Sequence, residues 1–372
     1  MVLFLSLLMT MNLILHYDIN KTIIISDAST NRGLRASLHS LMSEVCWGRF
    51  PESIPKKDRR PSDWEPVVNA PDTVPPTEDS VTFGTYLEDH TDIPKTERRR
   101  LKNEFACEGN IGERFMPYVR NLERSLTIEG HTEADKKFHF VVPAFYRLLD
   151  VLFSDELLQR VNWRIVFRSF GVDTPDVIAD INRYLAGDNP QFQPSNPDVA
   201  AACKIDLPRD TGALLRTGPS SDDVHISVVN DRGVVTTISG AVNIQNHIEN
   251  SVFQMHRNDL SGLTAKRFFV LRDDYRWWER NHESDTSGKL LIVQRPTNRE
   301  AIDSLIHQAF FDDNIERDRP HIVDVRDVFS FEPIPFSSTR DNALIRAEPY
   351  LAITDDNYFV SHFKRLLDQW TE

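Results

Sequence analysis

The chain begins with an apolar run that stops at a carboxylate. Residues 13–15 are apolar and lead to Asp18, and the polar Asn20 and Thr22 follow before apolar residues resume at Ile23. An apolar run bounded by polar residues in this way predicts a strand that is buried on both faces. Because the carboxyl end of a parallel strand borders a ligand crevice, we expect Asp18 to face one.

Two kinds of apolar pattern continue along the chain, one typical of helices and one typical of strands. Apolar residues at helical spacing predict helices at 33–47, 97–105, 113–126, 143–153, 175–185, 299–307 and 359–370. Apolar runs predict strands at 163–171, 268–271, 306–311 and 322–325, and a turn at 230–233 between two runs predicts a β-hairpin. Strands that alternate with helices predict an α/β fold with a mainly parallel sheet.

Long segments interrupt the expected core. The stretch between the first two strands is far longer than one crossover helix requires. We therefore expect a core made of residues 11–48, 136–186 and 288–372. Residues 49–135 would form a first insertion, and residues 187–287 a second insertion that contains the hairpin.

The composition of the chain limits the classes of function that the protein can have. The chain has 372 residues, of which 40% are hydrophobic, and this is enough for a sizeable core. The net charge of −13 argues against general binding to nucleic acid or to an anionic membrane, because both need basic surface. Three widely spaced cysteines predict reduced thiols in a cytoplasmic protein.

The amino terminus is apolar but does not read as a signal peptide. Residues 2–9 have no basic residue before them and no clear cleavage site after them, so we expect residues 1–10 to be an extension. No other stretch is long and apolar enough to span a bilayer.

Several candidate catalytic or metal-binding residues follow the predicted strands. They are, in order, Asp18, Ser169, Lys289, and the adjacent Asp312 and Asp313. Three of these positions end apolar runs, so we expect them to meet at one edge of the sheet. Two adjacent carboxylates repel each other and favour a bound cation.

Other residues compete for these roles. Asp273 and Asp274 follow the strand at 268–271 and form a rival acidic pair, and Lys266 is a rival to Lys289. Ser169 could simply cap the next turn, and the later acidic pair could do the same. The histidines lack zinc-ligand spacing, and the sequence has no glycine-rich phosphate loop.

The segment from Asp18 to Thr22 resembles the first motif of the haloacid dehalogenase-like (HAD) superfamily, a hydrophobic run followed by Asp-x-Asp-x-Thr. The order of the later groups is similar to that of the other three HAD signatures. The resemblance covers the strand-bearing segments, about half of the chain, and extends to uncharacterised HAD-like proteins of microbial eukaryotes. It implies a Rossmann-like core with two insertions resembling caps, and a Mg²⁺-dependent phosphohydrolase that acts on a small phosphorylated molecule.

The resemblance also implies roles for individual residues. Asp18 would be the nucleophile and would form an aspartyl-phosphate. Asp18, the backbone carbonyl of Asn20, Asp312 and Asp313 would hold Mg²⁺. The chain departs from the pattern at Asn20, where most phosphatases of the superfamily carry a second Asp that exchanges protons.

The remaining roles concern the substrate. Thr22 and Ser169 would bind the phosphoryl group, and Lys289 would neutralise charge on the nucleophile and on the transferred group. Because an amide cannot exchange a proton at neutral pH, Asn20 leaves a second interpretation open, a catalytically weak HAD-like protein that serves as a binding or scaffold module. A third is hydrolysis of a carbon–halogen bond by Asp18 without metal, which the acidic pair disfavours.

Overall fold

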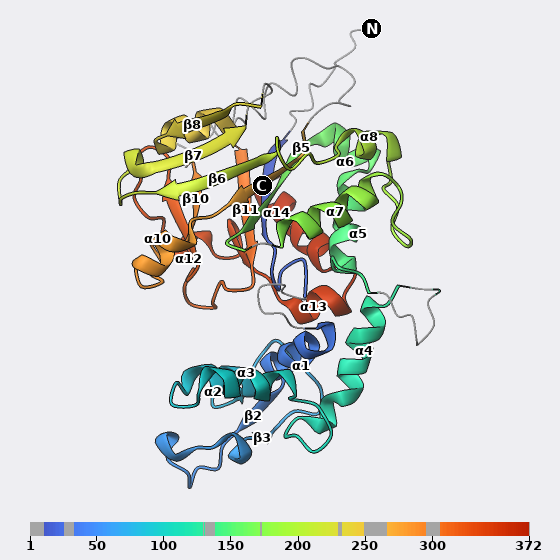
Figure 1. The fold of residues 1–372 in the computed structure, drawn as a ribbon, viewed down its shortest axis with the longest axis vertical. Coiled ribbons are helices and arrows are strands. Elements are labelled where there is room, and N and C mark those ends of the chain that lie inside the picture. Colours follow the sequence, from blue (N-terminus) through green and yellow to red (C-terminus); the bar gives the residue numbers. More distant parts are fainter. Residues whose placement is uncertain are drawn as a thin grey trace. The chain divides into compact units, whose positions relative to one another are not determined.

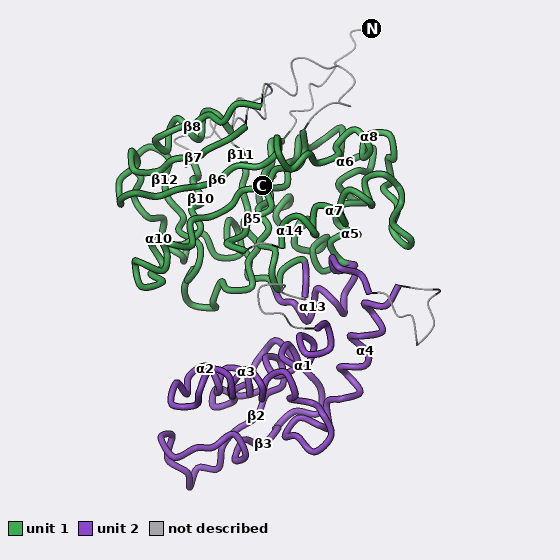
Figure 2. Tube along the Cα trace, viewed as in Figure 1, with its two compact units in different colours: residues 1–23, 144–347, 357–372 green, residues 24–143, 348–356 purple. Residues whose placement is uncertain are grey.

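The computed structural model describes residues 11–25, 33–128, 130, 138–171, 173–229, 233–248, 266–294 and 306–371 (Figure 1). The chain forms two compact units (Figure 2). Unit 1 consists of Met1–Ile23, Ala144–Ala347 and Asn357–Glu372, and unit 2 consists of Ile24–Pro143 and Glu348–Asp356.

The centre of unit 1 is an eight-stranded sheet with the order β13-β11-β1-β5-β9-β6-β7-β8. Its strands are β1 (Met11–Asp18), β5 (Val161–Ser169), β6 (Thr211–Arg216), β7 (Val224–Val229), β8 (Val235–Ser239), β9 (Phe268–Arg272), β11 (Ile306–Asp312) and β13 (Leu344–Arg346). Neighbours from β13 to β6 are parallel, whereas β6, β7 and β8 pair in antiparallel fashion. The predicted α/β class with a mainly parallel sheet is therefore confirmed.

Helices cover one face of the strand that carries Asp18. The helices of unit 1 whose limits are described are α5 (Pro143–Leu152), α6 (Asp155–Arg160), α7 (Thr174–Leu185), α8 (Pro197–Ala202), α10 (Tyr275–Arg280), α12 (Phe336–Thr339) and α14 (Tyr358–Thr371), and residues 241–248 are helical as well. The ring of Tyr17 lies 5.0 Å from that of Phe145 in α5 and 5.4 Å from that of Phe359 in α14. Tyr17 is fully buried, so this aromatic layer fixes the helix-facing side of β1.

A second, smaller sheet covers the opposite face of β1. It consists of β10 (Lys289–Val293) and β12 (Val323–Asp327), which pair in parallel. Ile14 of β1 belongs to the same buried cluster as Leu290 and Ile292 of β10. Because side chains alternate along a strand, His16 and Asp18 point to this face as well.

Unit 2 has its own core. Its helices are α1 (Leu34–Val45), α2 (Phe83–Asp89), α3 (Lys95–Asn103), α4 (Met116–Leu126) and α13 (Pro349–Thr354), and its small antiparallel sheet consists of β2 (Trp47–Arg49), β3 (Glu65–Pro66) and β4 (Val81–Thr82). The ring of Trp64 lies 5.5 Å from that of Phe83 and 5.9 Å from that of Phe105. All three side chains are buried, and such aromatic contacts account for a separate core.

The unit boundaries correct the expected domain limits. Helix α1, expected in the core segment 11–48, belongs to unit 2, because it packs against α2, α3 and α4. Helix α13 was likewise expected in the core segment 288–372 but belongs to unit 2. Residues 187–287 are not a separate insertion, since β9 pairs with β5, and β6 pairs with β9, in the parallel ladder of the main sheet. A cap role for residues 49–135 stays a prediction.

The structure also defines the limits and strand neighbours of several predicted elements. The hairpin is confirmed as β7 and β8, while its turn at 230–232 lies outside the described residues. Most of the helix expected at 299–307 also lies outside them, and His307 belongs to strand β11. The strand expected at 322–325 is β12, which pairs with β10, whereas the outer neighbour of β11 is β13.

Two general expectations concern the described part of the chain. No helix within it has the length and apolar character needed to cross a membrane. The three cysteines all lie in this part and form no disulfide within it. The expected extension at residues 1–10 lies outside the described residues.

Candidate active site

Three neighbouring strands end at the same edge of the main sheet. Asp18, Ser169 and Asp312 are the last residues of β1, β5 and β11. These strands are adjacent and parallel, in the order β11-β1-β5. Their carboxyl ends therefore meet at one edge, the place where parallel sheets bind ligands.

A sharp turn follows β1 and joins it to the segment after β11. Lys21 adopts a left-handed conformation with φ of 58°, and the N–H of Ile23 donates to the carbonyl of Ile19 at 3.1 Å. The turn leaves Thr22 fully buried, with its hydroxyl accepting a hydrogen bond from the N–H of Asp313 at 3.2 Å. Thr22 therefore holds the Asp313 segment, and the binding of a phosphoryl group by its hydroxyl stays a prediction.

Lys289 reaches this edge from the second sheet. Its side chain is 2% exposed, and Nζ donates hydrogen bonds to the carboxylates of Asp18 and Asp312, the latter at 2.7 Å. Gly288 makes the approach possible, because a Cβ there would lie 2.0 Å from the carbonyl oxygen of Ile322. The N–H of Lys289 donates to that carbonyl at 2.7 Å and starts β10.

Three carboxylates gather around this lysine. Oxygens of Asp18, Asp312 and Asp313 lie within 4.8 Å of one another. The side chain of Asn314 orients two of them, since its Nδ2 donates to Asp312 at 3.2 Å and to Asp313 at 2.8 Å. We call these three aspartates the acid cluster. Converging carboxylate oxygens at a partly open edge suit a hard divalent cation that keeps several waters.

Burial and the neighbouring opposite charges shift the pKa values of Asp18 and Lys289 in opposite directions. Burial raises the pKa of Asp18 to about 7, with Lys289 opposing the rise and Asp312 adding to it. Burial alone would lower the pKa of Lys289, but the charges of Asp18, Asp312 and Asp273 raise it above its ordinary value. Lys289 is therefore cationic, and a single cation beside three carboxylates leaves room for further positive charge.

Ser169 and Asn20 border the same small space. A Cβ added at Gly171 would lie 3.4 Å from Ser169 Oγ and 3.6 Å from Asn20 Nδ2. Ser169 Oγ accepts a hydrogen bond from the N–H of Gly171 at 2.8 Å, which leaves its own proton to donate. Asn20 Oδ1 is buried and has no hydrogen-bond partner among the described residues. A buried acceptor without a partner at a ligand edge points to a donor from water or substrate.

Behind the acid cluster lies an ion pair that sequence reasoning missed. Arg168 is 1% exposed and binds Asp273 through two hydrogen bonds, with Nε 2.9 Å from Oδ2. Its Nη1 lies 3.3 Å from His16 Nδ1. An arginine inside an apolar run indicates a buried ion pair, because a buried arginine needs a partner of opposite charge.

The rival residues occupy other places. Asp273 binds Arg168 and does not belong to the acid cluster, and Asp274 accepts a hydrogen bond from the N–H of Trp277 at 3.1 Å and caps α10. Lys266 pairs with Asp210 at 2.7 Å, and its side chain is half exposed. The structure therefore places Lys289, and not Lys266, beside Asp18.

Comparisons of the chain with protein-family models, with curated proteins and with solved structures gave no match. The function is therefore argued from the geometry and chemistry of this edge of the sheet.

Proposed function

We propose that the chain is a Mg²⁺-dependent, HAD-like phosphohydrolase that forms an aspartyl-phosphate on Asp18. One observation carries the proposal: a buried lysine binds the carboxylates of Asp18 and Asp312, beside the third carboxylate of Asp313. The HAD-like part rests on the motif from Asp18 to Thr22, and the mainly parallel sheet is compatible with the Rossmann-like core that it implies.

The acid cluster has the donors that the metal needs. Asp18, Asp312 and Asp313 would hold Mg²⁺, with the backbone carbonyl of Asn20 as a further ligand implied by the resemblance. When bound, Mg²⁺ supplies positive charge beside the phosphoryl oxygens. The negative excess of the cluster fits this requirement, since Lys289 offsets only one of the three carboxylates.

In the first step, a carboxylate oxygen of Asp18 attacks phosphorus. The bond between phosphorus and the leaving oxygen breaks, and that oxygen keeps the electron pair. Lys289 keeps its proton throughout, so its charge stabilises the negative charge that develops on the transferred group. The Ser169 hydroxyl donates to a phosphoryl oxygen, as its position at the end of β5 allows.

In the second step, water attacks the aspartyl-phosphate at phosphorus. The bond from phosphorus to Asp18 breaks, which releases inorganic phosphate and restores the carboxylate. Asn20 can accept a hydrogen bond from this water through its unpartnered Oδ1, but it cannot take the proton. Leaving groups that need no proton, such as those of aryl and acyl phosphates, therefore suit this site better than alkoxides.

A second candidate is a HAD-like binding module with little or no turnover. It is favoured by Asn20, because general acid–base help is worth about 10²–10⁴ in rate and this amide cannot supply it. The two candidates differ in whether bound Mg²⁺ is accompanied by hydrolysis.

Hydrolysis of p-nitrophenyl phosphate tests the proposal. We expect turnover with Mg²⁺ that is lost with EDTA and in Asp18→Asn. The matched control is Asp341→Asn, which makes the same change at an exposed residue of unit 1. Equal turnover by Asp18→Asn and the control would overturn the nucleophile. Mg²⁺ binding without any turnover would favour the binding module.

A further inference from the structure

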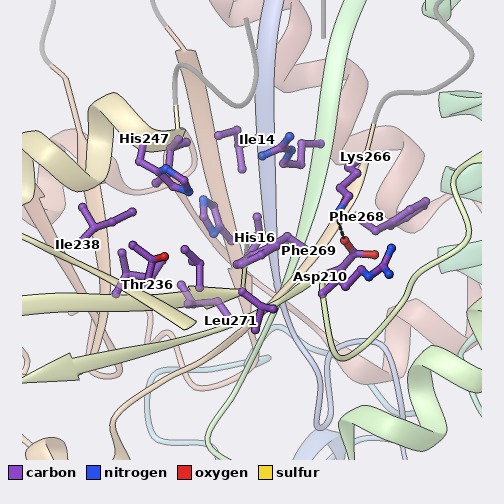
Figure 3. Close-up of a pocket in the computed structure, with 17 residues that line it drawn as sticks. Ile14, His16, Asp210, Thr236, Ile238, His247, Lys266, Phe268, Phe269 and Leu271 are labelled. Carbon is purple, nitrogen blue, oxygen red and sulfur yellow. Dashed lines mark ion pairs between the residues drawn. The ribbon is translucent and has the colours of Figure 1, made fainter. Parts of the chain in front are cut away.

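Unit 1 contains a pocket of about 530 Å³ that is separate from the acid cluster (Figure 3). Ile14 and His16 of β1 line it, from the same face of the strand as Asp18 but nearer its amino end. The described residues that line the pocket include neither Asp18 nor Lys289. The pocket is therefore a second candidate site in the same unit.

The hairpin at the end of the sheet forms one wall of the pocket. Ile226 and Val228 of β7 line it together with their ladder partners on β8, Ile238 and Thr236. Side chains two apart on a strand share a face, so these four residues form a continuous strip. Val235, which precedes Thr236 and therefore points to the other face of β8, is 65% exposed and lies outside the lining.

Most of the pocket wall is apolar. Ten of the seventeen lining residues are aliphatic or aromatic, and Phe268 and Phe269 are the largest of them. A volume of this size lies within the range of roughly 300–1,000 Å³ typical of small-molecule sites. The wall therefore fits an organic ligand with an apolar body.

The polar part of the lining is positive, in contrast to the acidic chain. Among the described lining residues, the three cations Arg164, Arg209 and Lys266 outnumber the single carboxylate, that of Asp210, whereas the whole chain carries a net charge of −13. Lys266 Nζ lies 2.7 Å from Asp210 Oδ1, and Arg209 also approaches Asp206 at 3.5 Å. The lining thus retains an excess of positive charge, which attracts an anionic group.

The charged residues labelled in Figure 3 lie together at one side of the pocket, while apolar residues extend from there to the other side. Figure 3 shows Lys266 and Asp210 at one side, and Ile238 at the other. His16 of β1 lies between them (Figure 3). This separation matches a ligand with one charged end and a hydrocarbon body.

We propose that this pocket binds an amphipathic organic carboxylate. Its carboxylate group lies near Lys266 and Arg164, and its hydrocarbon body lies along the Phe269 and Ile238 wall. The proposal goes beyond the phosphohydrolase function and does not depend on Asp18 or on Mg²⁺.

Calorimetry with three ligands that share a ten-carbon chain tests the choice of head group. Decanoate, 1-decanol and decyltrimethylammonium are titrated into the full chain below their micelle concentrations. We expect decanoate to bind at least about tenfold more tightly than decanol, and the cation not to bind. Equal affinities, or no binding of decanoate, would overturn the proposal.

Two tryptophan variants of the same strand test the location. Ile238→Trp fills the pocket, while Val235→Trp places the same group on the exposed face of β8. Decanoate should raise the Tm of the wild type and of Val235→Trp, because it binds the folded state, but not that of Ile238→Trp. An equal rise in Tm in all three proteins would overturn the location.

A charge variant provides a measurement that does not depend on the folding of Ile238→Trp. Lys266 is more than half exposed, so Lys266→Met should fold. We expect it to weaken decanoate binding about three- to tenfold and to leave decanol binding unchanged. Unchanged decanoate binding would overturn the assignment of the carboxylate end.

Discussion

Lys289 Nζ lies 2.7 Å from Asp312 Oδ2 and also donates a hydrogen bond to Asp18, so one buried cation joins two carboxylates from neighbouring strands. Both aspartates and the lysine are almost fully buried. A carboxylate in such a place is costly without a partner, because little water is available to solvate it. Lys289 therefore supports the fold of this edge as well as the proposed chemistry.

Replacing Lys289 with Met should destabilise unit 1 by about 3–5 kcal/mol, because two buried carboxylates lose their partner. Millimolar Mg²⁺ should recover part of the loss by supplying positive charge. Urea unfolding with and without Mg²⁺ measures both effects. The control Lys266→Met breaks an ion pair whose lysine is half exposed and whose Asp210 carboxylate keeps a hydrogen bond from the N–H of Asp206, so it should cost less than Lys289→Met. Equal losses in the two variants would contradict this account of Lys289.

Replacing Asp313 with Asn should weaken Mg²⁺ binding by about tenfold or more, because affinity depends on the charge of the ligands. Asp313 is the partly exposed member of the acid cluster, so its change should disturb the fold less than a change at Asp18. Calorimetric titration with MgCl₂ measures the affinity, with Asp341→Asn as the control. An unchanged affinity would remove Asp313 from the metal site.

Replacing Asn20 with Asp should accelerate hydrolysis of alkyl phosphates by about 10²–10⁴, because the new carboxyl group can protonate the leaving alkoxide. Aryl phosphates should gain much less, since their leaving groups need no proton. Measuring kcat/KM for one ester of each class, with Mg²⁺ present, tests this difference. If both rates stay unchanged while Mg²⁺ still binds, Asn20 does not face the leaving group.

The buried pair of Arg168 and Asp273 should behave as one unit. Arg168→Met leaves the Asp273 carboxylate without its partner and should cost about 3–5 kcal/mol. Adding Asp273→Leu to this variant should recover much of the loss, because no unpaired charge then remains. A double-mutant cycle by urea unfolding measures the coupling. Additive losses would mean that the two residues act independently.

Acid should destabilise unit 1 partly through His307, whose pKa is lowered by burial to about 4. Between pH 6.5 and 4 the unfolded chain binds a proton at this site that the folded chain does not, so stability falls as the pH falls. After allowance for partial exposure, His307→Phe should reduce the loss of unfolding free energy from pH 7 to pH 5 by about 1–2 kcal/mol.

The phenylalanine keeps a ring that can stack on Trp370, whose centroid lies 4.9 Å from that of His307. Urea unfolding at pH 7 and at pH 5 measures the effect. The same pH dependence in wild type and variant would show that His307 does not contribute.

Local features of the sequence determined the class of fold and the edge where the candidate site lies. The apolar runs near Asp18, Ser169 and Asp312 predicted three strands, and all three form, with ends within two residues of those expected. Helical spacing similarly predicted α1, α5, α7 and α14. These features are readable because the period of a strand or helix, and the polar residue that ends it, lie within a few neighbouring positions.

Tertiary structure alone decided between the rival residues and paired the segments that no local pattern connects. It brought Lys289 to Asp18 across 271 residues of chain, paired Arg168 with Asp273, and assigned α1 to unit 2. It also placed β6 and β9 in the main sheet, where the antiparallel strands β7 and β8 next to β6 close one wall of the apolar pocket. Each of these outcomes depends on which buried faces and charges fit together between segments far apart in the chain. The spacing of residues within one segment does not specify its distant partner.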